Sequence, residues 1–272
     1  MARRLALVAG SGALVPEAIA AARARGWDVQ VFAAVPRADL IDANPVMLSV
    51  SDPAGSLAVI RKSGATHVCA VGAIELSDQQ RRTLMRFAGL SRGLGGLADR
   101  LLMRGFSGAA GGLGLRIVGI DELLPELLAP VGLIAGPAEA RPSDERCRMT
   151  VEAARAIGKL DMGQAVVLSG DRIIAAEGVE RTDGLIARVG EYVKQGLVDS
   201  GESLILAKAL KPKQPRYIDM PAIGPDTVTA CAEAGIGAIV VEAGGTLLIE
   251  RRRLEERASA RGIAVAGVRV KG

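Results

Sequence analysis

Two short apolar runs near the start of the chain, joined by a helical pattern, place the strongest limit on the fold. Residues 5–9 form the first run, residues 16–25 have helical character, and residues 29–34 form the second run. Parallel strands need a long crossover between them, and a helix supplies it. A third apolar run follows at residues 66–71. The first half of the chain therefore predicts a Rossmann-like α/β layer.

The second half of the chain mixes hairpin and helix signals. Apolar runs at residues 164–168 and 172–176 flank a Ser-Gly-Asp turn, which predicts a β-hairpin. Residues 182–198 have a helical pattern, and residues 204–209 form another apolar run of strand length. This half therefore predicts a mixed α/β domain.

A stretch rich in Pro and Gly, residues 129–144, separates the two halves. Domain boundaries commonly fall in such stretches, and we place this one near Gly136. The prediction is an α/β protein of two domains. The N-terminal Rossmann-like α/β domain covers residues 1–136, and the C-terminal mixed α/β domain covers residues 137–272.

Composition narrows the classes of function. Aromatic residues make up only 2% of the chain, too few for a base-stacking platform, so we expect no nucleic-acid partner. The formal charge of +4 fits an anionic ligand or an anionic membrane surface. The single histidine, His67, lies in an apolar run and is interpreted as a strand residue, which excludes mechanisms that need two histidines. The three cysteines are far apart, which suits a reducing cytoplasm.

Two features bear on location in the cell. The apolar run after Arg3 and Arg4 soon meets Gly and Ser, which is not the pattern of a signal peptide. The most apolar stretch, residues 234–249, contains Glu242 and a Gly pair, so it predicts two buried strands around a turn rather than a membrane span. We therefore expect a cytoplasmic protein with peripheral contact to the inner membrane.

The segment from Lys208 to Val228 sets carboxylates among cations in one non-periodic stretch. Four prolines prevent a helix or a central strand from running through all of it, so we expect an ordered loop. They are Pro212, Pro215, Pro221 and Pro225. Loops on a rigid scaffold often carry binding and catalytic residues.

Asp219 is the main candidate in that loop. In the structural interpretation, its carboxylate is satisfied by Arg216 or by backbone amides. In the interpretation we favour, Asp219 binds Mg²⁺ or Mn²⁺ against a phosphate, while Lys208, Lys211 and Arg216 neutralise charge.

A second polar cluster lies where an apolar strand meets a helical pattern. Glu177, Glu180 and Asp183 stand on either side of Arg181 there. Thr182 could cap the helix, which is the structural interpretation. Ligands of α/β folds collect at the mouth of the sheet, so we favour a functional role for this cluster.

The turn after the first strand, Gly10-Ser11-Gly12, begins like a dinucleotide-binding fingerprint, in which backbone N–H groups approach a phosphate. A third glycine is missing, and no Asp or Glu ends the next strand to hold a ribose. This disfavours a nicotinamide-dependent oxidoreductase. A tight turn and a contact with an anion or a uridine both stay open.

Three runs of the second half resemble one bacterial family in their order and spacing. They are Leu-Asp-Met-Gly-Gln-Ala-Val-Val at 160–167, Ala-Glu-Gly-Val-Glu-Arg-Thr-Asp-Gly-Leu-Ile-Ala-Arg at 176–188, and Lys-Pro-Lys-Gln-Pro-Arg-Tyr-Ile-Asp-Met-Pro-Ala-Ile-Gly-Pro-Asp-Thr-Val at 211–228. The opening Leu-Ala-Leu-Val-Ala-Gly-Ser-Gly-Ala-Leu-Val-Pro also matches. The chain is similar to the UDP-2,3-diacylglucosamine pyrophosphatases of the lipid A pathway in Gram-negative bacteria. It departs from that family's usual pattern at Arg181 (usually Gly), at Pro215 (usually acidic) and in residues 71–90.

The resemblance implies an enzyme that hydrolyses UDP-2,3-diacylglucosamine to 2,3-diacylglucosamine 1-phosphate (lipid X) and UMP with Mg²⁺ or Mn²⁺. Its substrate is a glycolipid nucleotide, its surface partner is the inner membrane, and a homodimer is compatible with it. The alternative, from another class, is a non-catalytic protein of the same fold that binds a nucleotide-sugar or a lipid.

The resemblance, together with the Gly-Ser-Gly turn and the cations of the loop described above, predicts the site residues. Asp219 is both catalytic and a metal ligand, and Asp183 and Lys208 are further catalytic candidates. The residues expected to bind the substrate are Gly10, Ser11, Gly12, Gln164, Glu177, Thr182, Lys211 and Arg216.

Overall fold

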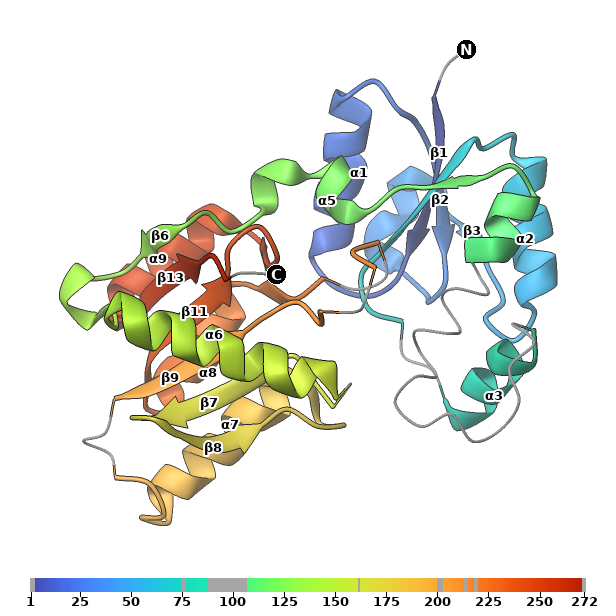
Figure 1. Ribbon diagram of the computed structural model, residues 1–272. Helices are drawn as coiled ribbons and strands as arrows, with labels where there is room; N and C mark the ends of the chain where they lie inside the picture. The colour runs from blue at the N-terminus through green and yellow to red at the C-terminus, as the bar shows by residue number, and fades with distance from the viewer. Residues whose placement is uncertain are drawn as a thin grey trace. The chain divides into compact units, whose positions relative to one another are not determined.

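The chain folds into two α/β units (Figure 1). The computed structural model describes residues 3–74, 77–87, 107–160, 162–199, 203–212, 215–217 and 220–270. The first unit contains the described residues up to Pro125 together with Pro215, Arg216 and Tyr217, and the second unit contains the others from Glu126 onward. The predicted α/β fold with two domains is confirmed.

The first unit has a five-stranded parallel sheet in the order β3-β2-β1-β4-β5. The central strand β1 is buried along its apolar residues Leu5–Ala9, as expected for a strand covered on both faces. The strands are β1 (Arg4–Ala9), β2 (Asp28–Ala33), β3 (Val46–Met47), β4 (His67–Val71) and β5 (Arg116–Ile117). The helices include α1 (Leu14–Ala24), η1 (Ala38–Ala43), α2 (Pro53–Lys62), α3 (Asp78–Phe87) and α5 (Ile120–Leu123), with η3 (Pro125–Leu127) where the units meet in sequence. This is the Rossmann-like layer that the sequence predicts.

The second unit has a six-stranded mixed sheet in the order β6-β13-β11-β9-β7-β8. The strands β9, β11 and β13 are mutually parallel, while β6 and β7 run against their neighbours. The strands are β6 (Gly132–Ala135), β7 (Ala165–Ser169), β8 (Arg172–Ala176), β9 (Leu204–Lys208), β11 (Ile236–Glu242) and β13 (Ala264–Val268). The helices are η4 (Ala138–Ala140), α6 (Asp144–Lys159), α7 (Arg181–Lys194), α8 (Pro225–Glu233) and α9 (Arg251–Arg261).

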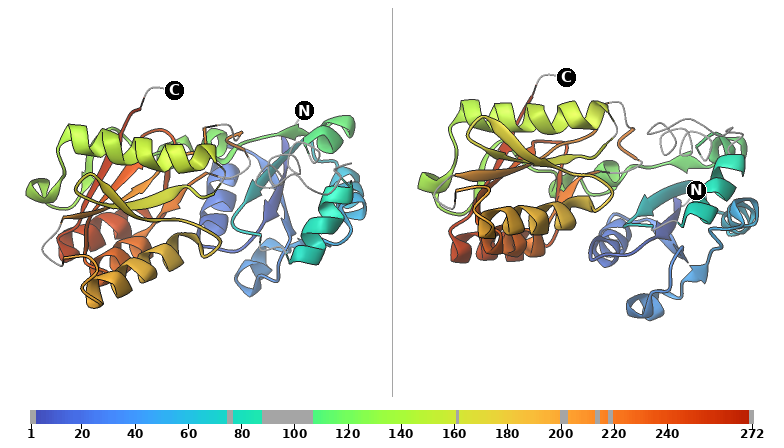
Figure 2. Two further views of the ribbon diagram at one scale, coloured as in Figure 1. Left: turned by 60° about the horizontal axis from the view of Figure 1, so that its bottom comes forward. Right: turned by 90° about the horizontal axis from the view of Figure 1, so that it is seen from below.

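Helices cover both faces of this sheet. Figure 2 shows α6 on one face and α7, α8 and α9 on the other. Alternate residues of one strand serve the two cores: Val166 and Leu168 pack on the α6 side, and Val167 packs on the side of the three helices. A strand buried on both faces must be apolar throughout, which explains the continuous runs in the sequence.

Two details differ from the sequence predictions. The predicted boundary lies near Gly136, whereas the units divide between Pro125 and Glu126, and β6 pairs with β13 in the second sheet. The two strands predicted within residues 234–249 exist but do not pair with each other. Instead, β11 joins the large sheet, and β12 (Leu247–Leu248) pairs with β10 (Ala222–Ile223). Strand partners were distant in sequence, so local pattern could not predict them.

The parallel strands give the second sheet two unlike edges. At the carboxyl edge, β9 ends at Lys208 and β11 ends at Glu242. The antiparallel strand β7 begins at this edge, because Ala165 pairs with Lys208, and it ends at the amino edge, where Ser169 pairs with Leu204. Residues at the two ends of β7 therefore belong to opposite edges of the sheet.

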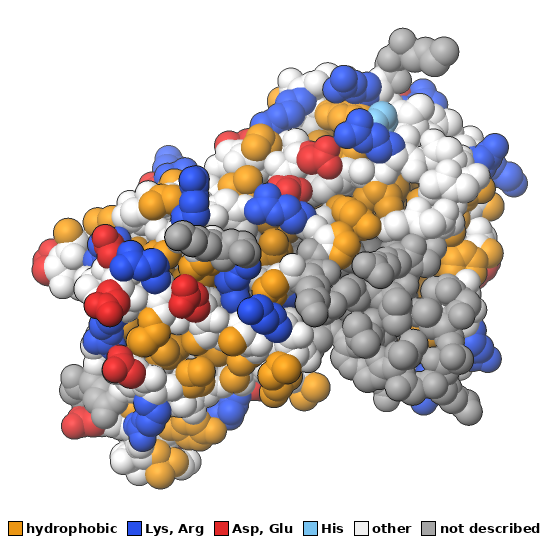
Figure 3. Space-filling view, viewed as in Figure 1, with side chains coloured by type: hydrophobic (Ala, Val, Ile, Leu, Met, Phe, Trp, Pro, Cys, Tyr) orange, Lys and Arg blue, Asp and Glu red, His pale blue; other side chains and the backbone are white. Residues whose placement is uncertain are grey.

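In the part of the chain that the structure describes, no helix is long and apolar enough to cross a membrane. On the face drawn in Figure 3, the basic side chains of the described residues are interspersed with acidic and apolar ones. The peripheral membrane contact stays a prediction.

Candidate functional site

Three of the predicted site residues meet at the carboxyl edge of the second sheet. The Glu177 side chain is 7% exposed and accepts two hydrogen bonds. Its Oε2 accepts from the Gln164 N–H at 2.7 Å, and its Oε1 accepts from the Thr182 hydroxyl at 3.1 Å. The carboxylate therefore ties the segment before β7 to the first turn of α7. The Thr182 side chain makes this bond instead of capping the helix, whose N-cap Glu180 has no side-chain cap.

Lys208 lies at the end of β9 and is 8% exposed. Its Nζ donates a hydrogen bond to the Ala222 carbonyl at 3.0 Å. Ala222 lies where the proline-rich loop returns to a strand, β10. Lys208, predicted to be catalytic, therefore also holds the returning end of the loop.

The other end of the loop is held by Glu242, which the sequence analysis did not assign to the site. Glu242 is 9% exposed at the end of β11. Its Oε2 accepts from the Leu210 N–H at 3.0 Å, and its Oε1 pairs with Nη1 of Arg155, on α6, at 2.6 Å. The loop that carries Asp219 is thus fastened by buried charged groups at Leu210 and at Ala222. A lone acid within the most apolar stretch of the chain was the signal that could have identified Glu242.

The acidic cluster around α7 is partly committed to ion pairs. Glu180 pairs with Arg188 at 2.5 Å, and Arg188 also donates to the Ala176 carbonyl at 2.8 Å. Backbone hydrogen bonding, with help from Arg188, holds the pKa of the Glu180 carboxyl below its usual value. Asp183 is exposed in the first turn of α7. Glu180 and Asp183 are thus both exposed at the edge, and Glu180 is held by Arg188.

The charges of Asp183 and Lys208 both affect the pKa of the buried thiol of Cys231 on α8. Burial raises the pKa of Cys231, the Asp183 charge raises it further, and the Lys208 charge lowers it. Opposing charges from two candidate catalytic residues thus act on one point beneath the carboxyl edge. The thiol itself stays protonated and packs in the core.

Arg181 has an unusual backbone for its residue type. Its φ is +63°, in the left-handed region that favours glycine. The resemblance drawn from the sequence has Gly at this position, and the structure supplies the physical reason. The arginine costs about 1–2 kcal/mol of backbone strain relative to an ordinary helical conformation.

The loop candidates are distributed over both units. Arg216 belongs to the first unit, where its Nη1 lies 3.3 Å from Oδ2 of Asp121. Lys211 belongs to the second unit and follows the fastened Leu210. Asp219 lies outside the described residues, so its place beside these cations stays a prediction.

The turn Gly10-Ser11-Gly12 is braced within the first unit. The N–H groups of Gly10 and Ser11 donate to the carbonyls of Val71 and Ala73, each at 2.8 Å. The Arg37 guanidinium donates to the carbonyls of Gly10 and Gly12. The first two amides of the turn are therefore engaged, which favours the tight-turn interpretation for Gly10 and Ser11. Contact of this turn with the substrate stays a prediction.

The structure was also searched for a metal site. Within the described ranges, no three His, Cys, Asp or Glu side chains gather closely enough to hold a metal ion. The two buried acids at the carboxyl edge, Glu177 and Glu242, are engaged with Gln164, Thr182, Leu210 and Arg155. A divalent ion therefore does not fit the described residues by themselves, and its predicted ligand Asp219 lies outside them.

These features define a two-unit α/β protein in which buried charges fasten a proline-rich loop at the carboxyl edge of a mixed sheet. The family model for the LpxI N-terminal domain matches residues 4–127, and the model for the LpxI C-terminal domain matches residues 130–266. The chain belongs to the LpxI family.

Comparison with characterised proteins gives one relative along the whole length. The UDP-2,3-diacylglucosamine pyrophosphatase LpxI of Caulobacter vibrioides is 30% identical over 278 residues, which cover 98% of each chain. This agrees with the resemblance drawn from the sequence.

Solved structures give only weak likenesses. An NAD-bound short-chain dehydrogenase/reductase superfamily protein of Agrobacterium tumefaciens is 19% identical with a TM-score of 0.26, over 47% of this chain and 37% of that one. A UDP-glucose-4-epimerase of Stenotrophomonas maltophila, with bound NAD and formylated UDP-arabinopyranose, is 11% identical with a TM-score of 0.33, over 99% and 87%. Neither TM-score supports a structural argument.

Proposed function

We propose that the chain hydrolyses the pyrophosphate of UDP-2,3-diacylglucosamine to 2,3-diacylglucosamine 1-phosphate (lipid X) and UMP in lipid A biosynthesis. The observation that carries this proposal is the end-to-end similarity to the Caulobacter vibrioides pyrophosphatase, through both domains. In the reaction, a water oxygen bonds to one phosphorus, and the bond from that phosphorus to the bridging oxygen breaks. The bridging oxygen leaves on the other product.

The residues divide into two roles in this proposal. Glu242 and Lys208 hold the loop at Leu210 and at Ala222, and Asp219, which lies between these two positions in the sequence, is the proposed catalytic carboxylate. Glu177 holds the Gln164 amide and the Thr182 hydroxyl, which places the exposed Asp183 at the same edge. Cations from the loop, Lys211 and Arg216, stabilise negative charge on the phosphates.

A divalent cation, Mg²⁺ or Mn²⁺, belongs to the proposal through Asp219. Such an ion polarises phosphate oxygens and lowers the pKa of a bound water. The test is to dialyse the protein against EDTA and measure UMP release before and after Mg²⁺ or Mn²⁺ is returned. Full activity in EDTA would exclude the metal requirement.

The activity is tested directly with purified protein, UDP-2,3-diacylglucosamine and Mg²⁺. The expected result is release of UMP, with at least a hundredfold lower kcat for Asp219→Ala, of the order found when a main electrostatic group is removed. Asp171→Asn, an exposed acid at the amino edge, is the control and should keep full activity. If Asp219→Ala releases UMP at the rate of the original protein, the catalytic assignment is wrong.

The same assay separates the enzyme from the non-catalytic alternative. Binding of the substrate without UMP release would favour a nucleotide-sugar or lipid-binding protein. Hydrolysis in water labelled with heavy oxygen shows which phosphorus the water attacks, because the label enters the product that contains that phosphorus.

A further inference from the structure

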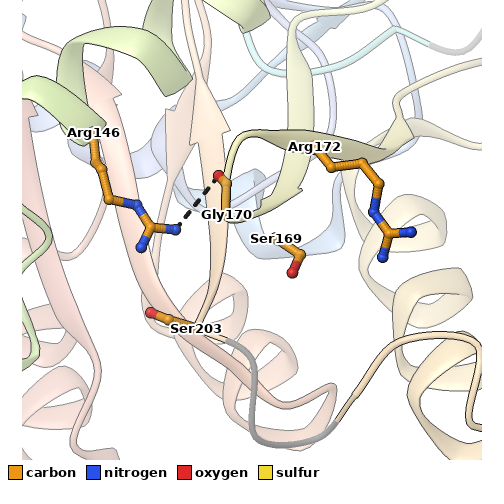
Figure 4. Close-up of a pocket in the computed structure, with 5 residues that line it drawn as sticks. All are labelled: Arg146, Ser169, Gly170, Arg172 and Ser203. Atoms are coloured by element: carbon orange, nitrogen blue, oxygen red, sulfur yellow. Dashed lines mark hydrogen bonds between the residues drawn. The ribbon is translucent and has the colours of Figure 1, made fainter.

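A pocket at the amino edge of the second sheet lies outside the site described above. It has a volume of about 460 Å³ and is lined by Arg146, Ser169, Gly170, Arg172 and Ser203 (Figure 4). The strand β7 separates it from the carboxyl edge by about 13 Å, at about 3.3 Å per residue between Ala165 and Ser169. A ligand in this pocket would therefore lie at the opposite end of β7 from the carboxyl edge.

The two arginines of the pocket have no carboxylate partner among its lining residues. Arg146 donates from Nη2 to the Gly170 carbonyl at 3.4 Å, which is long, and its buried Nε has no partner among the described residues. Arg172 is exposed and pairs with Ser169 through the backbone of the hairpin, but neither a hydrogen bond nor an ion pair joins its guanidinium to any other described residue. The pocket therefore carries two positive charges that the described parts of the chain leave uncompensated.

The hydroxyl of Ser169 adds a further hydrogen-bond donor to the pocket. Ser169 is 5% exposed and lines the pocket, yet its hydroxyl makes no hydrogen bond to any described residue. A hydroxyl in the wall of a pocket that makes no bond to the protein is available to donate to an oxygen of a bound ligand. Figure 4 shows Ser169 between Arg146 with Ser203 on one side and Arg172 on the other.

We propose that this pocket binds the phosphate group of an organic phosphate. Guanidinium and hydroxyl groups are the donors that phosphate oxygens accept from, and no acid among the lining residues opposes them. The volume lies in the range of small-molecule sites, which is larger than a bare phosphate needs. The phosphate ester can come from a water-soluble metabolite or from the headgroup of an anionic lipid. This site is independent of the proposed hydrolysis.

The two sources are separated by the probe. Soluble binding is measured by calorimetry with glycerol 3-phosphate, and glycerol is the uncharged control. Lipid binding is measured by sedimentation with phosphatidylcholine vesicles that contain or lack phosphatidic acid. Binding of either phosphate probe supports the site and identifies the source, and binding of neither overturns it.

Variants then assign the binding to the pocket. Arg172→Gln should weaken binding about tenfold, and the double variant Arg146→Gln with Arg172→Gln about a hundredfold, since each charge-assisted hydrogen bond is worth a factor of roughly ten or more. Arg148→Gln, an exposed position on the same helix that does not line the pocket, is the matched control and should bind like the original protein. Equal binding by the original protein and the double variant would place the phosphate elsewhere and overturn the proposal.

The variant Ser169→Ala distinguishes a loss of phosphate binding caused by a missing donor from one caused by unfolding. Its hydroxyl has no protein partner among the described residues, so the free energy of unfolding should not fall, whereas affinity for the phosphate probe should fall by about threefold to tenfold. UMP release should be unchanged in all of these variants. If Ser169→Ala binds the probe as tightly as the original protein does, the hydroxyl is not a ligand and the site is not the one proposed.

Discussion

At the carboxyl edge of the second sheet the buried charged groups have hydrogen-bond or ion-pair partners, whereas at the amino edge two arginines line a pocket that contains no carboxylate. Glu242 meets Arg155 and the Leu210 amide, and Lys208 meets the Ala222 carbonyl. Arg146 and Arg172, at the other edge, meet no carboxylate among the residues that line their pocket. The same sheet therefore uses charge in two ways.

The difference follows from burial. A buried ion pair adds little net stability over a packed apolar pair, but loss of one partner is costly. The pairs at the carboxyl edge are thus better explained by the position they give to a loop than by stability. An exposed cation such as Arg172 stays solvated, so it can remain free for a ligand at small cost.

The largest effect is expected when an arginine at the carboxyl edge loses its carboxylate partner, as in the pocket at the amino edge. Glu242→Gln leaves the mostly buried Arg155 without a carboxylate, so the free energy of unfolding should fall by about 3–5 kcal/mol. Urea denaturation measures this loss. Removal of both charges, as Arg155→Met with Glu242→Leu, should recover much of the stability.

That double variant also tests the purpose of the pair. In the double variant the Leu210 N–H has lost its carboxylate acceptor. Its kcat for UMP release should therefore be lower than that of the original protein, although its stability is largely recovered. Recovery of both stability and kcat would show that the pair serves the fold alone.

The next effect compares one hydroxyl at each edge. Thr182→Val removes the donor to Glu177 and should lower the free energy of unfolding by about 1.5–3 kcal/mol, because the lost bond was to a charged group. Ser169→Ala removes a hydroxyl that has no described partner and should change it by less than about 0.5 kcal/mol. Thermal unfolding of the two variants side by side checks this. Equal losses would contradict the contrast between the edges.

Lys208 should have a moderate effect on the reaction. If its role is to hold Ala222, Lys208→Met should lower kcat by about tenfold, the scale of one lost hydrogen bond. A loss above about a hundredfold would instead indicate contact with the reacting phosphate. Arg172→Gln, at the amino edge, is the control and should leave kcat unchanged.

The smallest effect concerns Arg181, the exposed cation of the carboxyl edge. Arg181→Gly relieves a positive φ and should raise the free energy of unfolding by about 0.5–1 kcal/mol after the entropy cost of glycine. Arg181→Ala keeps the strain and should show no gain. If Arg181→Gly and Arg181→Ala are equally stable, the positive φ at residue 181 does not strain the backbone of the original protein.

The sequence predicted much of the fold because periodicity is local. The strand–turn–helix pattern at the start gave β1, α1 and β2 nearly at their bounds, and the Ser-Gly-Asp turn gave the β7–β8 hairpin. Glu177, Thr182 and Gln164 were also identified, since they lie within one short stretch on either side of that hairpin.

Contacts between distant segments could not be read in the same way. Arg155 and Glu242 are 87 positions apart, and they meet because α6 crosses the sheet above the end of β11. The pocket at the amino edge likewise needs α6, the β7–β8 turn and the start of β9 together. Local residue types therefore specify the elements and their turns, while the three-dimensional arrangement selects the partner of each charge, because burial and distance arise only when the sheet and its helices pack.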